Sequence, residues 1–455
     1  MIRILTLILL LTSATTLTGA MKDGEMELLL VHAVWRHGDR SPIEICPTDP
    51  IQENDWTFGG GGFGQLSPLG MAQHMKLGKL VRSTYIDTGF LSKKYSSKEI
   101  YVRSTDLNRT LISAMSNMLG MYGQYDHFNE AGVDYPSETG WPAGYVPVPI
   151  HTVKFETDHV GNPETKCERH SLLWNMAKNS SEVQSFLKRP DVAELLRQLT
   201  EYCGKTINME NFWSIYDSLF VEQIHRNERL RAENKWFTDE LFSKIKEVED
   251  QFVLYENGLF DKTITMNNLD IGLEIVKLRG GSLFNEINSR MNMKIDCMNR
   301  VNAACSWINS LKYYAYSAHD TTVHAFLSVL DIPKEVIDDG GNPRYAAAVF
   351  IELWMNQTDN QPYFKLLYHS NAESEILYSI THFIDPCGPS IYCKLDIFKD
   401  FAARAKPDEP IKKWCDVDPR IPRKASMSST SSTPSWTISA IAFVVLSRLW
   451  LSAVN

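Results

Sequence analysis

The feature that most constrains the fold is the apolar run "EMELLLVHAVW", residues 25–35. Polar residues are too few in it for one face to be buried and the other solvated. A short run of this kind, rich in Leu and Val, predicts a strand that is buried on both faces of a sheet. Two further β-rich runs, residues 99–104 and 312–317, predict more strands of that sheet.

Helical periodicity recurs between these strands. It covers residues 66–85, 105–122 and 320–330, and the first of these helices is predicted to begin at Ser67 or Pro68. Strands that alternate with helices predict an α/β fold, in which a mixed, mostly parallel sheet carries helices on both faces. The runs that flank the turn-like "NQTDN", residues 346–355 and 362–369, predict a hairpin at the edge of this sheet.

Residues from about 155 to 275 differ from the rest of the chain. Their apolar residues repeat at helical spacing, as in residues 179–203 and 234–252, and no convincing strand interrupts them. We therefore predict a helical subdomain, residues 155–275. It is inserted into an α/β domain whose two parts are residues 21–154 and 276–420.

Both ends of the chain predict targeting segments rather than parts of the fold. Residues 1–20 combine an early basic residue, an apolar run and small residues before the cleavage point, as a signal peptide does. A Ser/Thr-rich linker, residues 421–436, precedes the hydrophobic segment 437–455, which Arg448 interrupts. A removed GPI-attachment signal is slightly favoured over a transmembrane helix, because an arginine within a bilayer is costly. We expect a protein of the secretory pathway (cell surface, lysosomal or extracellular) that is attached to a membrane through its C-terminal tail.

The secretory route makes the eight cysteines candidates for disulfide bonds, although the residues alone do not pair them. The sequons at Asn179 and Asn356 lie in polar segments and are candidate glycosylation sites. The formal net charge of −9 argues against a nucleic-acid partner, which would require a basic surface. Any anion site must therefore be a local cluster of arginines.

Charged residues cluster where the three predicted strands end. The first strand ends at "RHGDR", the second at "VRST" and the third at "SAHD". Ligands of open α/β sheets bind beyond the carboxyl ends of the strands. If the three strands are parallel neighbours, they bring together one group of side chains: Arg36, His37, Arg40, Arg103, His319 and Asp320.

This group fits phosphate chemistry. Guanidinium groups match phosphate oxygens in a bidentate way, so the three arginines are candidates to bind phosphate. Their positive field disfavours imidazolium, so His37 should stay neutral, attack phosphorus and form a phosphohistidine. Asp320 can protonate the leaving alcohol, which predicts an acidic pH optimum. No metal or other cofactor is required, because the arginines supply the positive charge.

Other interpretations of nearby residues are less specific. Asp320 can also be the N-cap of the helix that follows it, and the two roles are compatible. Arg109 is interpreted as a structural salt-bridge partner on the helix 105–122. The glycine-rich segment 59–70 lacks the Gly-Lys-Ser/Thr ending of a phosphate loop, so a flexible loop is favoured. The absence of "CxxC", "HExxH" and "GxSxG" from the sequence gives no support to a metal site or to a serine nucleophile.

Four motifs resemble those of the histidine acid phosphatases, most of all the animal lysosomal and prostatic type. They are "VWRHGDRSP", "GFGQLSPLGMAQHMKLG", "YVRSTDLNRTLISAM" and "YSAHDTTV", and the similarity runs from about Leu28 to Cys415. The resemblance implies a phosphoglycerate mutase-like α/β architecture with a helical subdomain over the active site. It implies His37 as nucleophile and Asp320 as proton donor, with phosphate bound by Arg36, Arg40, Arg103 and His319.

The same resemblance implies two disulfide bonds, Cys167–Cys415 and Cys387–Cys393. The pairing of four cysteines stays open: Cys46, Cys203, Cys297 and Cys305. The resemblance also implies a homodimer, and a hydrolase that acts on small-molecule phosphate monoesters without a cofactor. Phytate or lysophosphatidate specificity within the family is an alternative. A mutase of the wider superfamily is disfavoured by the signal peptide, and a non-catalytic protein that binds phosphate ligands is disfavoured by the intact His37 and Asp320.

Overall fold

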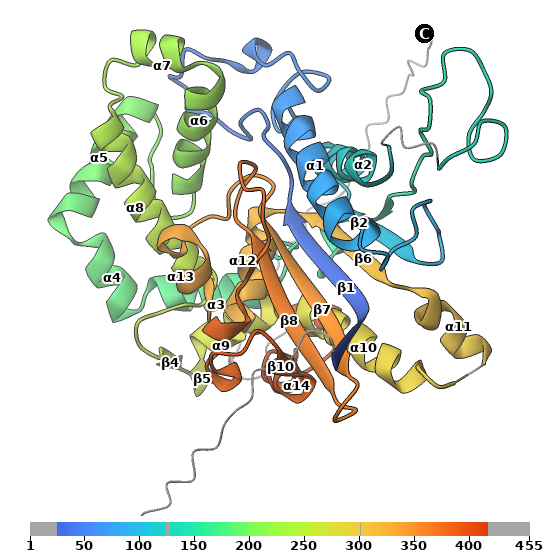
Figure 1. The fold of residues 1–455 in the computed structure, drawn as a ribbon. Coiled ribbons are helices and arrows are strands. Elements are labelled where there is room, and N and C mark those ends of the chain that lie inside the picture. The colour runs from blue at the N-terminus through green and yellow to red at the C-terminus, as the bar shows by residue number, and fades with distance from the viewer. Residues whose placement is uncertain (1–24, 124–127, 301, 417–455) are drawn as a thin grey trace, which may run out of the picture. The chain divides into compact units, whose positions relative to one another are not determined.

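The apolar strand predicted near the N-terminus lies inside an eight-stranded sheet in the computed structural model, which describes residues 25–123, 128–300 and 302–416 (Figure 1). This strand, β1 (Met26–Arg36), is buried at every residue from Leu29 onward. It pairs in parallel with β6 (Tyr313–Ala318) and antiparallel with β7 (Ala348–Asn356). Neighbouring strands therefore pair with both of its edges, and β1 is a central strand of the sheet.

The strand order is β10-β8-β7-β1-β6-β2-β3, and β9 pairs with β8. The remaining strands are β2 (Ile100–Thr105), β3 (His151–Val153), β8 (Pro362–His369), β9 (Tyr378–Ser379) and β10 (Cys393–Lys394). The prediction that the three strands with charged ends are parallel neighbours is confirmed, because β6 pairs in parallel with both β1 and β2. The predicted hairpin is β7–β8, but it is not at the edge, because β7 pairs with β1 and β10 lies outside β8. The sequence did not predict β3, whose residues are all exposed and carry no burial pattern.

Helices cover both faces of the sheet, as predicted. On one face, α1 (Pro68–Val81) and α2 (Asn108–Tyr122) share a core with Ala33 and Trp35 of β1. On the other face, α10 (Gly281–Cys297), α12 (Asp320–Val329) and α14 (Leu395–Arg404) share a core with Leu30 and Val34. The predicted start of α1 is also correct, because Ser67 caps it by accepting a hydrogen bond from the Gly70 amide.

The segment predicted to be helical contains α3 to α8, drawn in green to one side of the sheet in Figure 1. These helices are α3 (Glu168–Lys178), α4 (Ser181–Leu187), α5 (Pro190–Cys203), α6 (Phe212–His225), α7 (Asn227–Glu233) and α8 (Asp239–Glu256). They share an apolar core of their own, to which Phe212 and Phe252 belong. Ile51 and Trp56, from the segment between β1 and α1, complete that core and join the helices to the strand end.

Short elements complete the described chain. The strands β4 (Thr265–Met266) and β5 (Leu269–Asp270) form a small hairpin, and the remaining helices are α9 (Ile271–Arg279), α11 (Ala303–Ser310), α13 (Pro333–Val336) and α15 (Ile411–Asp416). Single turns of 3₁₀ or π helix lie at Glu53–Asp55, Arg82–Ile86, Phe155–Thr157, Asp338–Gly340, Thr381–Phe383 and Asp385–Cys387.

The structure has four disulfide bonds among the described residues: Cys46–Cys203, Cys167–Cys415, Cys297–Cys305 and Cys387–Cys393. They include both bonds that the resemblance implied, and they pair the four cysteines that the sequence left open. Two of them join residues 157 and 248 positions apart. Bonds that close such long loops restrict the unfolded chain most.

The predicted signal peptide 1–20, the predicted linker 421–436 and the hydrophobic segment 437–455 lie outside the described residues. Within the part that is described, no helix combines the length and the apolar character needed to span a bilayer. Asn179 is exposed, as a glycosylation site must be. Asn356 is 5% exposed, and its Oδ1 accepts hydrogen bonds from the backbone of the β7–β8 turn, so a glycan fits there poorly.

A buried carboxyl group on α6 makes the stability of the fold depend on pH. Burial raises the pKa of Glu222 to about 9, and the neighbouring carboxylate of Asp49 adds to the rise. In the unfolded chain this group has a pKa of 4.5, so between pH 4.5 and about 9 only the unfolded state loses the proton. The contribution of Glu222 to stability therefore falls as the pH rises through this range.

We predict that Glu222→Gln raises the melting temperature at pH 7 by roughly 2–4 °C and leaves it unchanged at pH 4.5. Calorimetry at both pH values measures the effect. Glu228→Gln, at an exposed position of the next helix, is the matched control and should change neither value. An equal shift of the Glu222→Gln protein at both pH values would contradict the assignment of a neutral carboxyl group.

Candidate active site

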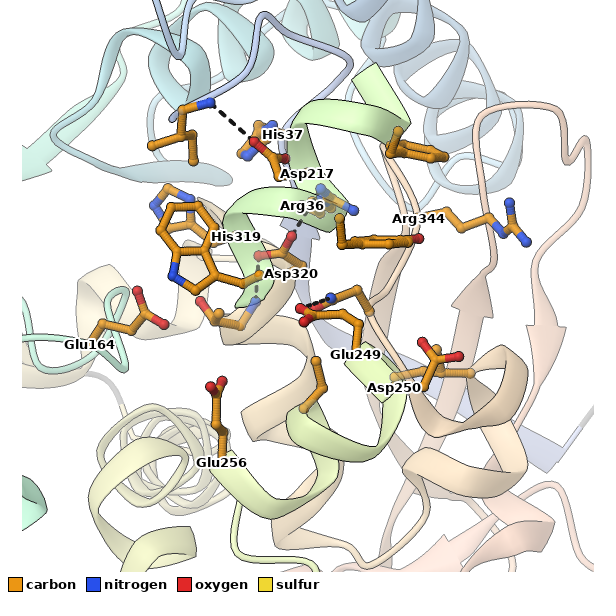
Figure 2. Close-up of a pocket in the computed structure, with 18 of the residues that line it drawn as sticks. Arg36, His37, Glu164, Asp217, Glu249, Asp250, Glu256, His319, Asp320 and Arg344 are labelled. Atoms are coloured by element: carbon orange, nitrogen blue, oxygen red, sulfur yellow. Dashed lines mark hydrogen bonds and ion pairs between the residues drawn. The ribbon is translucent and has the colours of Figure 1, made fainter. Parts of the chain in front are cut away.

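The carboxyl ends of β1 and β6 open into a cavity of about 570 Å³ (Figure 2). Arg36 is the last residue of β1, and His37 follows it directly. His319 and Asp320 come directly after β6. All four line the cavity, as does Arg40. Five of the six side chains that the sequence predicted to meet therefore do so.

The ring of His37 is fixed in one tautomer. Its Nδ1 lies 2.8 Å from the backbone carbonyl oxygen of Gly38, which can only accept a hydrogen bond. Nδ1 therefore carries the proton, and Nε2 keeps its lone pair. The backbone here packs tightly against α1, because a Cβ atom at Gly38 would lie 2.4 Å from the carbonyl oxygen of Gly70. Only glycine lets the strand end approach the helix so closely.

The imidazole of His37 is held neutral. Its burial is the largest cause of a pKa well below the usual value, and Arg109, Arg40 and Arg36 lower the pKa further. The residue is 1% exposed. The sequence predicted a neutral ring from the arginine charges alone, whereas burial contributes more.

Each guanidinium group at the end of β1 is oriented by a carboxylate. Arg36 donates to Asp320 Oδ2 at 2.9 Å, and it lies over the ring of Tyr345 with 4.3 Å between guanidinium carbon and ring centroid. Arg40 forms a bidentate pair with Asp217 at 3.0 and 2.8 Å. Asp217 belongs to α6, so this helix positions the side chain of Arg40, which follows the central strand β1. The sequence did not predict Asp217, because nothing in its local pattern points to the strand end.

Arg103 does not join the cavity, which corrects the sequence prediction. β2 continues to Thr105, so Arg103 lies two residues before the strand end. Its guanidinium group pairs with the buried carboxylate of Asp158 and, at 3.4 Å, with Glu286.

Arg109 takes the place that Arg103 was expected to fill. It lies in the first turn of α2 and lines the cavity. No carboxylate pairs with it in the described part of the chain, which contradicts its interpretation as a salt-bridge residue. Burial lowers the pKa of Arg109 to about 10, and the charge of Arg40 contributes, so Arg109 stays cationic at acidic and neutral pH. The sequence held one signal for this role, because Arg109 lies six residues after Arg103, in the helix that follows the strand.

His319 and Asp320 complete the group. His319 is the N-cap residue of α12, its Nε2 lies 2.9 Å from the hydroxyl oxygen of Thr105, and burial lowers its pKa to about 3. Asp320 is the first helical residue rather than the N-cap. Burial alone would raise the pKa of Asp320, but Arg36 and Arg40 outweigh it, so the pKa lies below the usual value.

Comparisons with known proteins place this geometry in a family. Residues 27–369 match the Histidine phosphatase superfamily (branch 2). The chain belongs to this superfamily. It is 36% identical over 401 residues to Putative acid phosphatase 10 of Caenorhabditis elegans, covering 87% of this chain and 95% of the relative. It is 32% identical over 386 residues to prostatic acid phosphatase of Homo sapiens, covering 84% of this chain and 86% of the relative.

The fold agrees with that membership. The apo form of Hafnia alvei phytase superposes with a TM-score of 0.58 at 14% sequence identity, covering 88% of this chain and 100% of the phytase. This protein is a histidine acid phosphatase, and its mixed sheet with helices on both faces is the fold of the group.

We predict that Arg109→Ala lowers kcat/KM for a phosphate monoester by about 10²–10³-fold and weakens inhibition by inorganic phosphate, because a cation is lost at the bound phosphoryl group. Arg103→Ala is the matched variant. It should change kcat/KM less than about tenfold but lower the melting temperature, because it leaves Asp158 buried without its cation. The reverse ranking in kcat/KM would show that the two arginines have been assigned wrongly.

Proposed function

We propose that this histidine acid phosphatase hydrolyses phosphate monoesters through a phosphohistidine on Nε2 of His37, with Asp320 as proton donor. The observation that carries the proposal is the neutral ring of His37, with Nε2 unprotonated, surrounded by Arg36, Arg40 and Arg109. The guanidinium groups stabilise the phosphoryl oxygens and leave phosphorus open to in-line attack by Nε2.

In the first step a P–N bond forms at His37 as the ester P–O bond breaks. The leaving oxygen takes the proton of Asp320, and the alcohol departs. In the second step the carboxylate of Asp320 removes a proton from water. The water oxygen attacks phosphorus, the P–N bond breaks, and inorganic phosphate is released as the ring returns to its neutral form.

The charge balance of the site explains why an aspartate can serve as the acid. In the free protein, Arg36 and Arg40 hold the pKa of Asp320 down, despite the opposing effect of burial. A bound phosphoryl group brings negative charge between the same arginines and the carboxyl group, which favours its protonated form. The acid is still best protonated at low pH, so we expect an acidic optimum.

The predictions about location and assembly rest on other features. Four disulfide bonds and the resemblance to prostatic acid phosphatase support the secretory pathway. The exposed Asn179 supports glycosylation. Membrane attachment through the C-terminal tail and a homodimer stay predictions from the sequence and the resemblance.

The proposal is tested by Asp320→Asn with two substrates that differ in their leaving group. An amide cannot protonate the leaving oxygen, so we predict a loss of about 10²–10⁴-fold in kcat for an alkyl phosphate and a much smaller loss for p-nitrophenyl phosphate. Asp217→Asn is the control. It loosens Arg40 without touching the leaving oxygen, so it should slow both substrates by the same factor. A loss that is equal for the two substrates in Asp320→Asn would exclude Asp320 as the acid.

A further inference from the structure

Two carboxylates of α8 face the catalytic cavity beyond Asp320. Glu249 and Glu256 are seven residues apart, with Val253 between them, so they lie on one face of the helix. All three residues line the cavity. Figure 2 shows the two carboxylates on the side of Asp320 that faces away from His37, with Glu249 the nearer to Asp320.

These two carboxylates differ from the other acidic groups of the cavity, each of which has a cation. The paired groups are Asp217 with Arg40, Asp250 with Lys246, Asp338 with Arg344, Glu210 with Lys178 and Glu164 with Arg279. Glu249 is 4% exposed, and its one hydrogen bond is from the amide of Asn342 to Oε1 at 3.3 Å. Its Oε2 has no donor and no cation among the described residues. The side chain of Glu256 forms neither a hydrogen bond nor an ion pair with the described residues.

Glu249 is buried and Glu256 half-buried, and neither has a cation at ion-pair distance among the described residues, so both hold their protons more tightly than an exposed carboxyl group does. Burial is the main cause that raises the pKa of Glu249 well above its usual value and that of Glu256 to about 7. Around Glu249 lie the carboxyl groups of Glu256, Asp250 and Asp320 and the amide of Asn342. Around Glu256 lie the guanidinium group of Arg279 and the carboxyl groups of Glu164 and Glu210. A cation placed between the two would favour their charged forms and release protons.

The same cavity also has an aromatic lining. Trp213, Tyr216 and Phe220 follow each other at helical spacing on α6 and line the cavity together. The rings of Tyr216 and Phe220 stack with 5.9 Å between their centroids. Aromatic faces attract organic cations, and unpaired carboxylates do so as well.

We propose that this part of the cavity binds an ammonium group on the alcohol of the substrate, so that the preferred substrates are phosphate monoesters of amino alcohols. The inference rests on the proposed function, because the phosphate end of such a molecule is held at His37. The leaving oxygen then lies at Asp320, and the ammonium group reaches Glu249 and Glu256. A molecule with further phosphate groups would set them against these carboxylates, so polyphosphates are poor substrates.

The experiment compares 2-aminoethyl phosphate with propyl phosphate, which replaces the ammonium group by a methyl group of similar size. We expect kcat/KM at pH 6.5 to be at least about tenfold higher for the aminoethyl ester. This ratio should shrink toward one at pH 4.5, because the ammonium group then competes with an about hundredfold higher proton concentration for Glu249 and Glu256. Glu249→Gln and Glu256→Gln should each lower the ratio at pH 6.5. Glu240 is an exposed residue of α8 that pairs with Lys244, so Glu240→Gln should leave the aminoethyl-to-propyl ratio unchanged.

The outcomes separate this inference from the proposed function. Hydrolysis of propyl phosphate with an aminoethyl-to-propyl ratio near one would overturn the ammonium site and leave the phosphatase mechanism standing. Failure to hydrolyse either ester would overturn the mechanism itself. If Glu249→Gln does not fold, three measurements still test the inference. They are the aminoethyl-to-propyl ratio of the unmodified protein, the pH dependence of that ratio, and the ratio of the Glu256→Gln protein. Faster hydrolysis of inositol hexakisphosphate than of 2-aminoethyl phosphate would also contradict the inference.

Discussion

The site depends on one physical condition, the burial of an uncharged imidazole next to several guanidinium groups. His37 is 1% exposed and its pKa is well below the usual value, first because of burial and then because of Arg109, Arg40 and Arg36. The Gly38 carbonyl fixes the proton on Nδ1. The parallel pairing of β1 with β6 makes this possible, since it sets the ends of the two strands side by side and adds His319 and Asp320 to the same wall.

The arginines can gather there because carboxylates from other segments pair with two of them and offset their positive charge. Asp217 of α6 fixes Arg40, and Asp320 of α12 fixes Arg36. Arg109 alone has no acidic partner in the described chain, so its charge is available to a bound anion. The helices beside the sheet therefore contribute directly to the cavity. α6 orients a phosphate-facing arginine and supplies an aromatic wall, and α8 supplies the carboxylates at the far end of the cavity.

The sequence predicts the strands and the site residues at their ends, because these follow from local patterns. The other site residues depend on contacts between segments that are distant in the chain. The strand 25–35 carries an unmistakable apolar pattern, and "RHGDR" and "SAHD" lie directly at strand ends, so most of the site follows from them. Arg103 misled the prediction because it lies two residues before the end of β2, where its side chain pairs with Asp158 and Glu286 instead of lining the cavity. Asp217 and Glu249 give no local signal, since their roles come from the docking of α6 and α8 against the strand ends.

The central claim is tested most directly by trapping the intermediate. A phosphate monoester labelled in its phosphoryl group is mixed with the protein at acidic pH, and the reaction is stopped in alkali within one turnover. Peptide mapping by mass spectrometry then locates the label. The account predicts one phosphoryl group on Nε2 of His37. It would be contradicted by phosphate on Nδ1 or on another residue, or by rapid release of phosphate with no labelled protein at any time.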